Sequence, residues 1–449
     1  MHRILRILFV VLAASLLAYI ALFENYMRLL EGFDFQSKLV WLLAAGAVFL
    51  LVAAWRFPVR WNFLIFLLFL CVLCVEVVLQ ALCWMGVVPG ITAKLRAPYG
   101  RVYWSAEGRG NSIRNRYGWY YPKFDESAPF RIAYIGDSQT EAVEVPPDRN
   151  QAADLNTLLR KTRPDMAVLG MGTHGTCPAF HLDVLDYAWR HFQPREAIVE
   201  VSLGANLTEM LPELNHIPPS GYIYYSLDSS NRLALNPLSA PVRERRIRGM
   251  EICHRSLLVN ASAIFDSHCM IFRTLDSLRD AFQQRRRQML LTAKSDGLGQ
   301  TEGGELGRIG FNPVPFAVPR PAQGQLALNI LEAELRRCKE ICDAHGMTLR
   351  IVTVPVFPRP FYETQHGTNW TLHIGNYDYL APEQDLMDFA RANAIPIAPI
   401  GHTFKAQGLS VDEIRSLYLS DGVGHLTVKG HERVSQIVFS DFYAKPASP

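Results

Sequence analysis

The chain has 449 residues, of which 49% are hydrophobic, and it carries a formal net charge of +3. This length allows two or three domains, and so small a charge gives no support for nucleic-acid binding. Eight cysteines are present, but none has the paired spacing of a zinc site. Five of them follow the apolar amino-terminal segment, and an odd number cannot all pair with one another, which excludes a disulfide scaffold. Two of these five, Cys338 and Cys342, fall on the apolar face of a predicted helix, where we expect buried free thiols.

Apolar residues crowd into the first ninety positions, where three runs are each about long enough to cross a bilayer. The runs are residues 7–23, 39–55 and 63–84, and tryptophans lie near span ends, as is typical of interfacial aromatic residues. The first run is longer than the core of a usual signal peptide, and no small-x-small cleavage site follows it cleanly. We therefore expect residues 1–87 to form an uncleaved anchor of three transmembrane helices.

Basic residues give this anchor a predicted orientation. Arg3 and Arg6 precede the first run, and the short second loop holds Arg56 and Arg60 with no acid, whereas the first loop mixes both signs. By the positive-inside rule, the amino terminus and the second loop lie in the cytoplasm. Three crossings then leave the rest of the chain outside. In a bacterium this means an inner (cytoplasmic) membrane protein whose large domain is periplasmic or extracellular.

Glu76 and Gln80 are polar residues one helical turn apart inside the third apolar run. An acid within a membrane span is a functional hypothesis by default. One interpretation is a role in helix packing or in docking a multi-spanning membrane partner. The other is that the two side chains only pack against the neighbouring spans or reach the outer interface. A catalytic role for Glu76 is not expected.

Residues 88–129 form a linker and lead-in, and after them short apolar runs alternate with helical patterns. This alternation is typical of a parallel α/β sheet. It predicts strands at residues 131–135, 166–169, 197–203, 348–356 and 395–400. It predicts helices at residues 150–161, 179–191, 323–345 and 382–392, and a last helix that ends near residue 442. We therefore expect one domain over residues 130–449.

The alternation is interrupted between about residues 211 and 322, which we interpret as an insertion over the sheet edge, helical in its middle. It holds a strand-like tyrosine-rich stretch at residues 222–225 and a glycine-rich loop at residues 295–310. Arginine clusters lie at residues 243–248 and 285–287. Such clusters either bind an anionic glycan or lipid headgroups or form a solvated helix face.

Reactive or stabilising groups follow several of the predicted strands. Gly136-Asp137-Ser138 ends the first strand, Gly172 follows the second, Asn206 follows the third, and Asp421 and His425 lie near the carboxyl end. Read alone, Gly136-Asp137-Ser138 is either a nucleophile turn or a polar turn with a helix cap. Because the carboxyl ends of parallel strands meet at one sheet edge, these residues can converge on one pocket. Ester hydrolysis needs such groups: a serine, a histidine base with an acid beside it, and N–H donors for the oxyanion.

The order and spacing of these residues resemble the SGNH/GDSL hydrolase superfamily, from about residue 131 to residue 442. The resemblance implies a doubly wound, flavodoxin-like three-layer α/β/α domain. It implies Ser138 as nucleophile, His425 as base and Asp421 as the acid that orients the base. The Ser138 amide, the Gly172 amide and the Asn206 side chain would hold the oxyanion. The stretch Asn115-Arg116-Tyr117-Gly118-Trp119 resembles a lead-in segment of membrane-anchored or secreted members.

The sequence departs from the family pattern at the last block. Three residues lie between Asp421 and His425, where family members have two or, in some branches, one. Gly422 and Gly424 could absorb the extra residue. Leu207 also stands where an aspartate often follows the asparagine.

We expect a membrane-anchored serine esterase or O-acyltransferase that acts on acyl esters, notably O-acetyl esters, of envelope or exported glycans. Two alternatives stay open. One is a lipase or lysophospholipase fed from the membrane, and the other is a degenerate SGNH domain that binds glycan or serves as a scaffold in an export complex. Because His174, His425 and His431 lack partners at metal-ligand spacing, we expect no metal, and we expect no other cofactor. His174 either lines the pocket or makes a local turn hydrogen bond.

Overall fold

The computed structural model divides the chain into two compact units, and each is described by itself. The first unit holds residues 1–104, 109–118 and 245–289, and the second holds residues 105–108, 119–244 and 290–449. The structure describes residues 3–4, 6–15, 17, 36–84, 101–102, 112–176, 178–215, 218–219, 221–254, 314–357, 359–371, 373–374, 376–419 and 424–444.

The centre of the second unit is a five-stranded sheet in which every strand pair is parallel. Its strands are β3 (Phe130–Gly136), β4 (Met166–Gly172), β5 (Glu196–Ser202), β8 (Thr348–Val354) and β11 (Ile397–Pro399). They lie in the order β4-β3-β5-β8-β11, so the first strand in sequence lies between the second and the third. This is the flavodoxin-like order, in which the chain reverses direction across the sheet beside the first strand. The five strands predicted from the apolar runs are confirmed.

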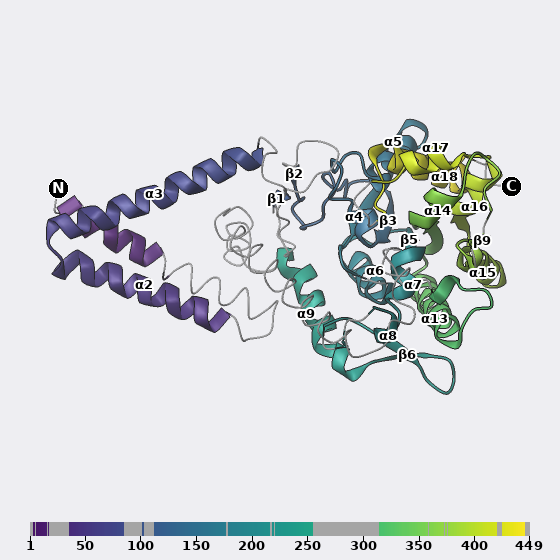
Figure 1. Ribbon diagram of the computed structural model, residues 1–449, viewed down its shortest axis with the longest axis horizontal. Coiled ribbons are helices and arrows are strands. Elements are labelled where there is room, and N and C mark those ends of the chain that lie inside the picture. The colour runs from purple at the N-terminus through teal and green to yellow at the C-terminus, as the bar shows by residue number, and fades with distance from the viewer. Residues whose placement is uncertain are drawn as a thin grey trace. The chain divides into compact units, whose positions relative to one another are not determined.

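Helices cover both faces of this sheet (Figure 1). The helices α5 (Gln151–Thr162) and α18 (Val428–Phe442) pack against each other on one side. On the other side α6 (Pro178–Phe192) and α15 (Ala381–Ala392) flank α13 (Ala322–Ala344). Right-handed crossovers require this distribution, because the chain moves one way from β3 to β4 and the opposite way afterwards. The predicted helices are confirmed, and Cys338 and Cys342 are buried free thiols on α13, as expected.

Part of the predicted insertion is described. The strand β6 (Tyr225–Leu227) pairs with β7 (Leu233–Leu235) as an antiparallel hairpin, and α9 (Ala240–Met250) follows. On α9 the Arg243 guanidinium forms a bidentate ion pair with the buried Asp183 carboxylate of α6. Arg243 therefore fastens the insertion to the domain. The glycine-rich loop and the arginines at residues 285–287 lie outside the described residues.

The remaining elements are short. They are β1 (Arg101–Val102), β2 (Ser112–Ile113), α4 (Ser138–Glu141), α7 (Leu203–Thr208), α8 (Pro212–Asn215), η1 (Pro237–Ser239), η2 (Glu251–His254), η3 (Val314–Phe316), α14 (Arg359–Thr364), β9 (His373–Ile374), β10 (Tyr377–Asp378), α16 (Ile400–Ala406) and α17 (Val411–Ser416). Two of them, α4 and α7, follow β3 and β5 at the sheet edge that holds the candidate site.

The first unit contains α2 (Gln36–Arg56) and α3 (Val59–Trp84), and residues Arg6–Ser15 are also helical. Among the described residues, one helical stretch, Val59–Leu82, is long and apolar enough to cross a membrane, with a mean hydropathy of 2.8. Within α3 the Gln80 amide donates a 2.8 Å hydrogen bond to Glu76. Residues 18–35, which include the end of the first predicted span and most of the loop after it, lie outside the described residues, so three crossings stay a prediction.

Glu200, in the middle of β5, is a carboxyl group fully buried in the second unit. It accepts hydrogen bonds from the Tyr134 hydroxyl, at 2.9 Å, and from the Gln151 amide. Burial and, to a smaller extent, the neighbouring Asp137 carboxyl raise the pKa of Glu200 to about 8. Between its ordinary pKa and this value, the folded protein holds a proton that the unfolded chain has released. The free energy of unfolding therefore falls as the pH rises through this window and levels off above it.

We predict that Glu200→Gln makes the thermal unfolding midpoint less sensitive to pH. Glutamine keeps the shape and the acceptor oxygen but does not ionise, so the term that weakens the wild-type protein between pH 6 and pH 9 disappears. Thermal unfolding at both pH values measures the difference. An equal drop in wild type and variant would show that Glu200 is not the buried acid that titrates in this range.

Candidate active site

The predicted nucleophile lies on a tight turn at the carboxyl end of β3. The strand ends at Gly136. The Asp137 side chain caps the four-residue helix α4 by accepting a 2.9 Å hydrogen bond from the Gln139 backbone amide. Ser138 is the first residue of α4 and is half-buried. The turn thus places the hydroxyl at the sheet edge beside β3 and its neighbours, where open α/β folds hold ligands.

His425 lies against this serine, although 287 positions separate them in the sequence. The His425 Nε2 atom is 3.1 Å from the Ser138 Oγ atom, within hydrogen-bond distance. His425 precedes α18 and is buried. The structure therefore brings together two residues that the sequence assigned to one reaction.

The Gln139 side chain holds the loop that carries His425. Its Nε2 atom donates a 2.9 Å hydrogen bond to the Gly424 carbonyl, and its Oε1 atom accepts a 3.1 Å hydrogen bond from the Leu426 amide. These two backbone groups flank His425 on either side. Because Gln139 directly follows Ser138, the distance between nucleophile and base is fixed by a residue next to the nucleophile. This role could not be predicted, because a single glutamine forms no sequence motif.

The second ring nitrogen of His425 faces a carboxylate from an unpredicted residue. His425 Nδ1 lies 3.1 Å from Glu144 Oε1, and both side chains are buried. The distance is that of an ion pair, while the oxygen lies off the ideal hydrogen-bond direction. Burial raises the pKa of Glu144, and the charge on His425 opposes that shift. Asp421, the predicted acid, lies outside the described residues.

Gly172 ends β4 directly beside α4. A Cβ atom at this position would lie 2.0 Å from the Glu141 backbone nitrogen and 2.4 Å from the Thr140 carbonyl carbon. Only glycine allows β4 and α4 to approach this closely. The following loop is held by Glu141, whose carboxylate accepts a 2.6 Å hydrogen bond from the His174 amide. This bond uses the His174 backbone and joins residues 33 positions apart, so both alternatives for His174 stay predictions.

Asn206, on α7 after β5, is fully buried and joined to the nucleophile turn through Asp137. Its Nδ2 atom donates a 2.9 Å hydrogen bond to Asp137 Oδ2 and lies 3.4 Å from Glu209 Oε2. Its Oδ1 atom accepts a 2.8 Å hydrogen bond from the Ser202 amide. Burial raises the pKa of Asp137, and hydrogen bonds from the Gln139 backbone amide, the Ser202 hydroxyl and the Asn206 side chain oppose the shift. The contacts show Asn206 as a support for the turn, and its role at an oxyanion stays a prediction.

His431 lies in the first turn of α18, as expected from the sequence, and its side chain is buried. Its Nδ1 atom is 2.7 Å from Gln151 Oε1. Burial and, to a smaller extent, the nearby His425 lower the pKa of His431 to about 3. The ring is therefore neutral at physiological pH and belongs to the packing between α5 and α18.

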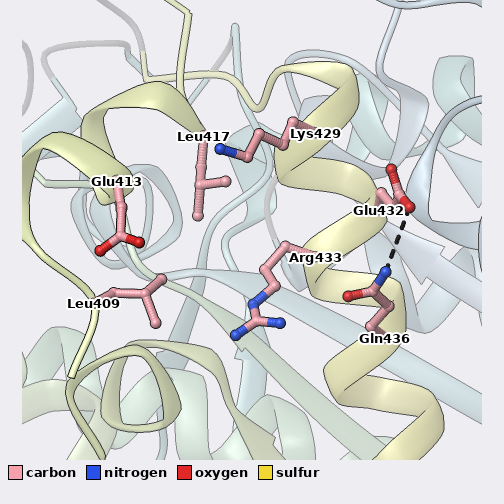
Figure 2. Close-up of a pocket in the computed structure, with 7 residues that line it drawn as sticks. All are labelled: Leu409, Glu413, Leu417, Lys429, Glu432, Arg433 and Gln436. Atoms are coloured by element: carbon pink, nitrogen blue, oxygen red, sulfur yellow. Dashed lines mark hydrogen bonds between the residues drawn. The ribbon is translucent and has the colours of Figure 1, made fainter. Parts of the chain in front are cut away.

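A surface pocket of about 320 Å³ lies beside α17 and α18 (Figure 2). Its lining mixes both signs of charge, with Glu413 and Glu432 against Lys429 and Arg433. Leu409, Leu417 and Gln436 complete the lining, and none of the residues around Ser138 contributes to it. The pocket is therefore separate from the candidate site.

No protein-family model and no curated protein sequence matches this chain. Solved structures do match. One is TesA, with 11% identity over 70% of this chain and 98% of that chain, at a TM-score of 0.34. A second is Axe2, an acetylxylan esterase from Geobacillus stearothermophilus, with 10% identity over 71% of this chain and 96% of that chain, at a TM-score of 0.33.

A third match is a member of the lipolytic protein G-D-S-L family from Veillonella parvula, with 10% identity over 70% of this chain and 100% of that chain, at a TM-score of 0.31.

We predict that Gly172→Ala lowers the free energy of unfolding by about 3 kcal/mol, because the added methyl group overlaps backbone atoms that cannot move independently. Denaturant unfolding measures the loss. Gly175→Ala is the matched comparison, since an added Cβ atom there meets nothing within 4 Å and only the left-handed backbone, at a φ of +63°, opposes it. That cost is about 1 to 2 kcal/mol. Equal losses in the two variants would contradict the close approach of β4 and α4.

Proposed function

We propose that this protein is a membrane-anchored serine esterase of the SGNH/GDSL type, acting through an acyl-serine intermediate. The observation that carries the proposal is the 3.1 Å distance between Ser138 Oγ and His425 Nε2 at the carboxyl edge of the parallel sheet. A serine hydroxyl is a weak nucleophile until a base accepts its proton, and histidine does so near neutral pH. Both side chains are placed by separate elements that Gln139 connects.

In the proposed reaction His425 Nε2 takes the proton of Ser138 as Oγ attacks the carbonyl carbon of an ester. The tetrahedral intermediate collapses, the bond to the alcohol oxygen breaks, and His425 returns the proton to that oxygen. The acyl group is now bound to Ser138. Water, deprotonated by His425, then attacks the acyl carbon and releases the carboxylic acid, while the proton returns to Ser138.

The oxyanion needs N–H donors directed at the position where negative charge develops. We propose the amides of Ser138 and Gly172, which lie at neighbouring strand ends, as two of them. The Asn206 amide group has two hydrogens. One is donated to Asp137 at 2.9 Å, and the other makes a longer hydrogen bond to Glu209, at 3.4 Å; the amide group is the proposed third donor.

The anchor is the second part of the proposal. The apolar helical stretch Val59–Leu82 supports insertion in a membrane. The helical segments Arg6–Ser15 and α2 (Gln36–Arg56) fit two further spans, with the amino terminus in the cytoplasm. An odd number of crossings places the α/β domain outside the cytoplasm, where acylated envelope or exported glycans are the proposed substrates.

The same acyl-serine intermediate would also serve an O-acyltransferase, in which a sugar hydroxyl takes the place of water. Three spans are few for carrying an activated acyl donor across the bilayer. A transferase would therefore act with a multi-spanning partner, and the polar pair Glu76 and Gln80 on α3 is the proposed docking point.

We predict that Ser138→Ala lowers p-nitrophenyl acetate hydrolysis by about 10³-fold or more, because no other group takes the acyl group. Labelling by a fluorophosphonate, followed by peptide mass analysis, should map to Ser138 in the wild-type protein and vanish in the variant. Ser127→Ala, which removes an exposed serine before β3, is the control and should behave as wild type. Labelling at another residue, or none at all, would contradict the proposed nucleophile.

We predict that Gln139→Ala lowers kcat by about 10- to 100-fold, because loss of its two hydrogen bonds frees the His425 loop and a small displacement of the base is costly. Steady-state kinetics with p-nitrophenyl acetate measure the effect. Gln384→Ala removes an exposed glutamine from α15 and should leave kcat unchanged. Wild-type kcat in Gln139→Ala would show that the loop is held by other contacts.

A further inference from the structure

A buried carboxylate in the second unit lies where a catalytic histidine needs one. Glu144 is 1% exposed and its Oε1 atom is 3.1 Å from His425 Nδ1, on the side of the ring away from Ser138. Burying a carboxylate is costly unless a charged or hydrogen-bonding partner compensates. His425 is such a partner, because it becomes positively charged when it accepts the serine proton.

The imidazole ring leaves one position for such an acid. When Nε2 accepts the proton of Ser138, the neutral ring carries its own hydrogen on Nδ1, and one N–H donates in one direction. Glu144 lies at that nitrogen.

The backbone after α4 delivers Glu144 to this position. Ala142 ends the helix in the left-handed conformation, at φ 51° and ψ 51°, with its amide donating to the Ser138 carbonyl. Non-glycine residues adopt this conformation at a cost that the surrounding structure must offset. The segment after Ala142 is held by the Tyr120 hydroxyl, which donates a 2.8 Å hydrogen bond to the Val145 carbonyl. Glu144 is thereby fixed between two anchored residues.

Several charged groups face this pair and bear on its titration. Glu141 and His174 interact with Glu144, the first raising and the second lowering its pKa. Asp137 and His431 interact with His425 from the nucleophile turn and from α18. Among them, Glu144 is the group placed at Nδ1.

We propose that Glu144 is the acid of the reaction: it orients His425 and stabilises the imidazolium, in place of the predicted Asp421. Glu144 acts through His425 and touches no substrate, so it is a positioning residue. The inference rests on the proposed esterase function. The nucleophile begins α4, the base lies in the loop before α18, and the acid lies in the loop after α4. Nucleophile and acid lie six positions apart in one segment.

Steady-state kinetics on the full-length protein in detergent test this assignment with p-nitrophenyl acetate as substrate. Glu144→Gln should lower kcat by about 10²- to 10⁴-fold with little change in KM. Glu144→Asp, which keeps the charge, should recover part of the loss. Asp148→Asn removes an exposed acid four positions further on and should match wild type. A larger loss in Asp421→Asn than in Glu144→Gln would overturn the assignment.

Histidine titration by NMR gives a readout that does not depend on activity. With ¹³C-labelled histidine and His425→Gln to assign the signal, Glu144→Gln should lower the pH at which His425 titrates by about 1 to 3 units, because a neighbouring negative charge is lost. Asp421→Asn should shift it less. The reverse order would overturn the role of Glu144. If the wild-type protein hydrolyses no ester, the proposed function fails. The titration still shows in that case whether the Glu144 carboxylate acts on His425.

Discussion

The two hydrogen bonds of the Gln139 side chain hold the carboxyl-terminal loop against the first turn of the α/β domain. Gln139 is buried, so both hydrogen bonds are shielded from water, and breaking either would leave a buried polar group unpaired. Ser138 and His425 are thus positioned by the hydrogen bonds of Gln139, and breaking these bonds costs free energy.

Buried acids gather around this contact. Asp137, Glu141, Glu144 and Glu200 are all less than 5% exposed and lie on β5 or in the segment after β3. Each has its own donor or cation: Asn206 for Asp137, the His174 backbone amide for Glu141, His425 for Glu144 and Tyr134 for Glu200. Burial raises the pKa of Glu200 and of Glu144, and repulsion from the neighbouring acids adds to both shifts. Functional sites often contain such unfavourable interactions between like charges, which the rest of the fold offsets.

Most of the fold could be predicted because it depends on patterns that the sequence carries directly. Strands buried on both faces appear as apolar runs, and helices such as α13 show a stripe of apolar residues, so the predicted ends lie within three residues of the observed ones. Ser138 and His425 were assigned from the resemblance to the SGNH/GDSL superfamily, and the rule that parallel strand ends meet at one edge explains why they can converge. Glu144 and Gln139 were missed because their roles come from a left-handed turn and a long-range contact, and neither leaves a local pattern. The sequence does depart from the family pattern at the acid, because three residues separate Asp421 from His425.

A structure of the protein after reaction with a phosphonate ester tests the central claim most directly. The phosphorus atom should be bonded to Ser138 Oγ, with a phosphoryl oxygen within hydrogen-bond distance of the Ser138 and Gly172 amides and the Glu144 carboxylate still at His425 Nδ1. An unmodified Ser138, or a phosphoryl oxygen directed away from both amides, would contradict a catalytic site built on Ser138 and His425.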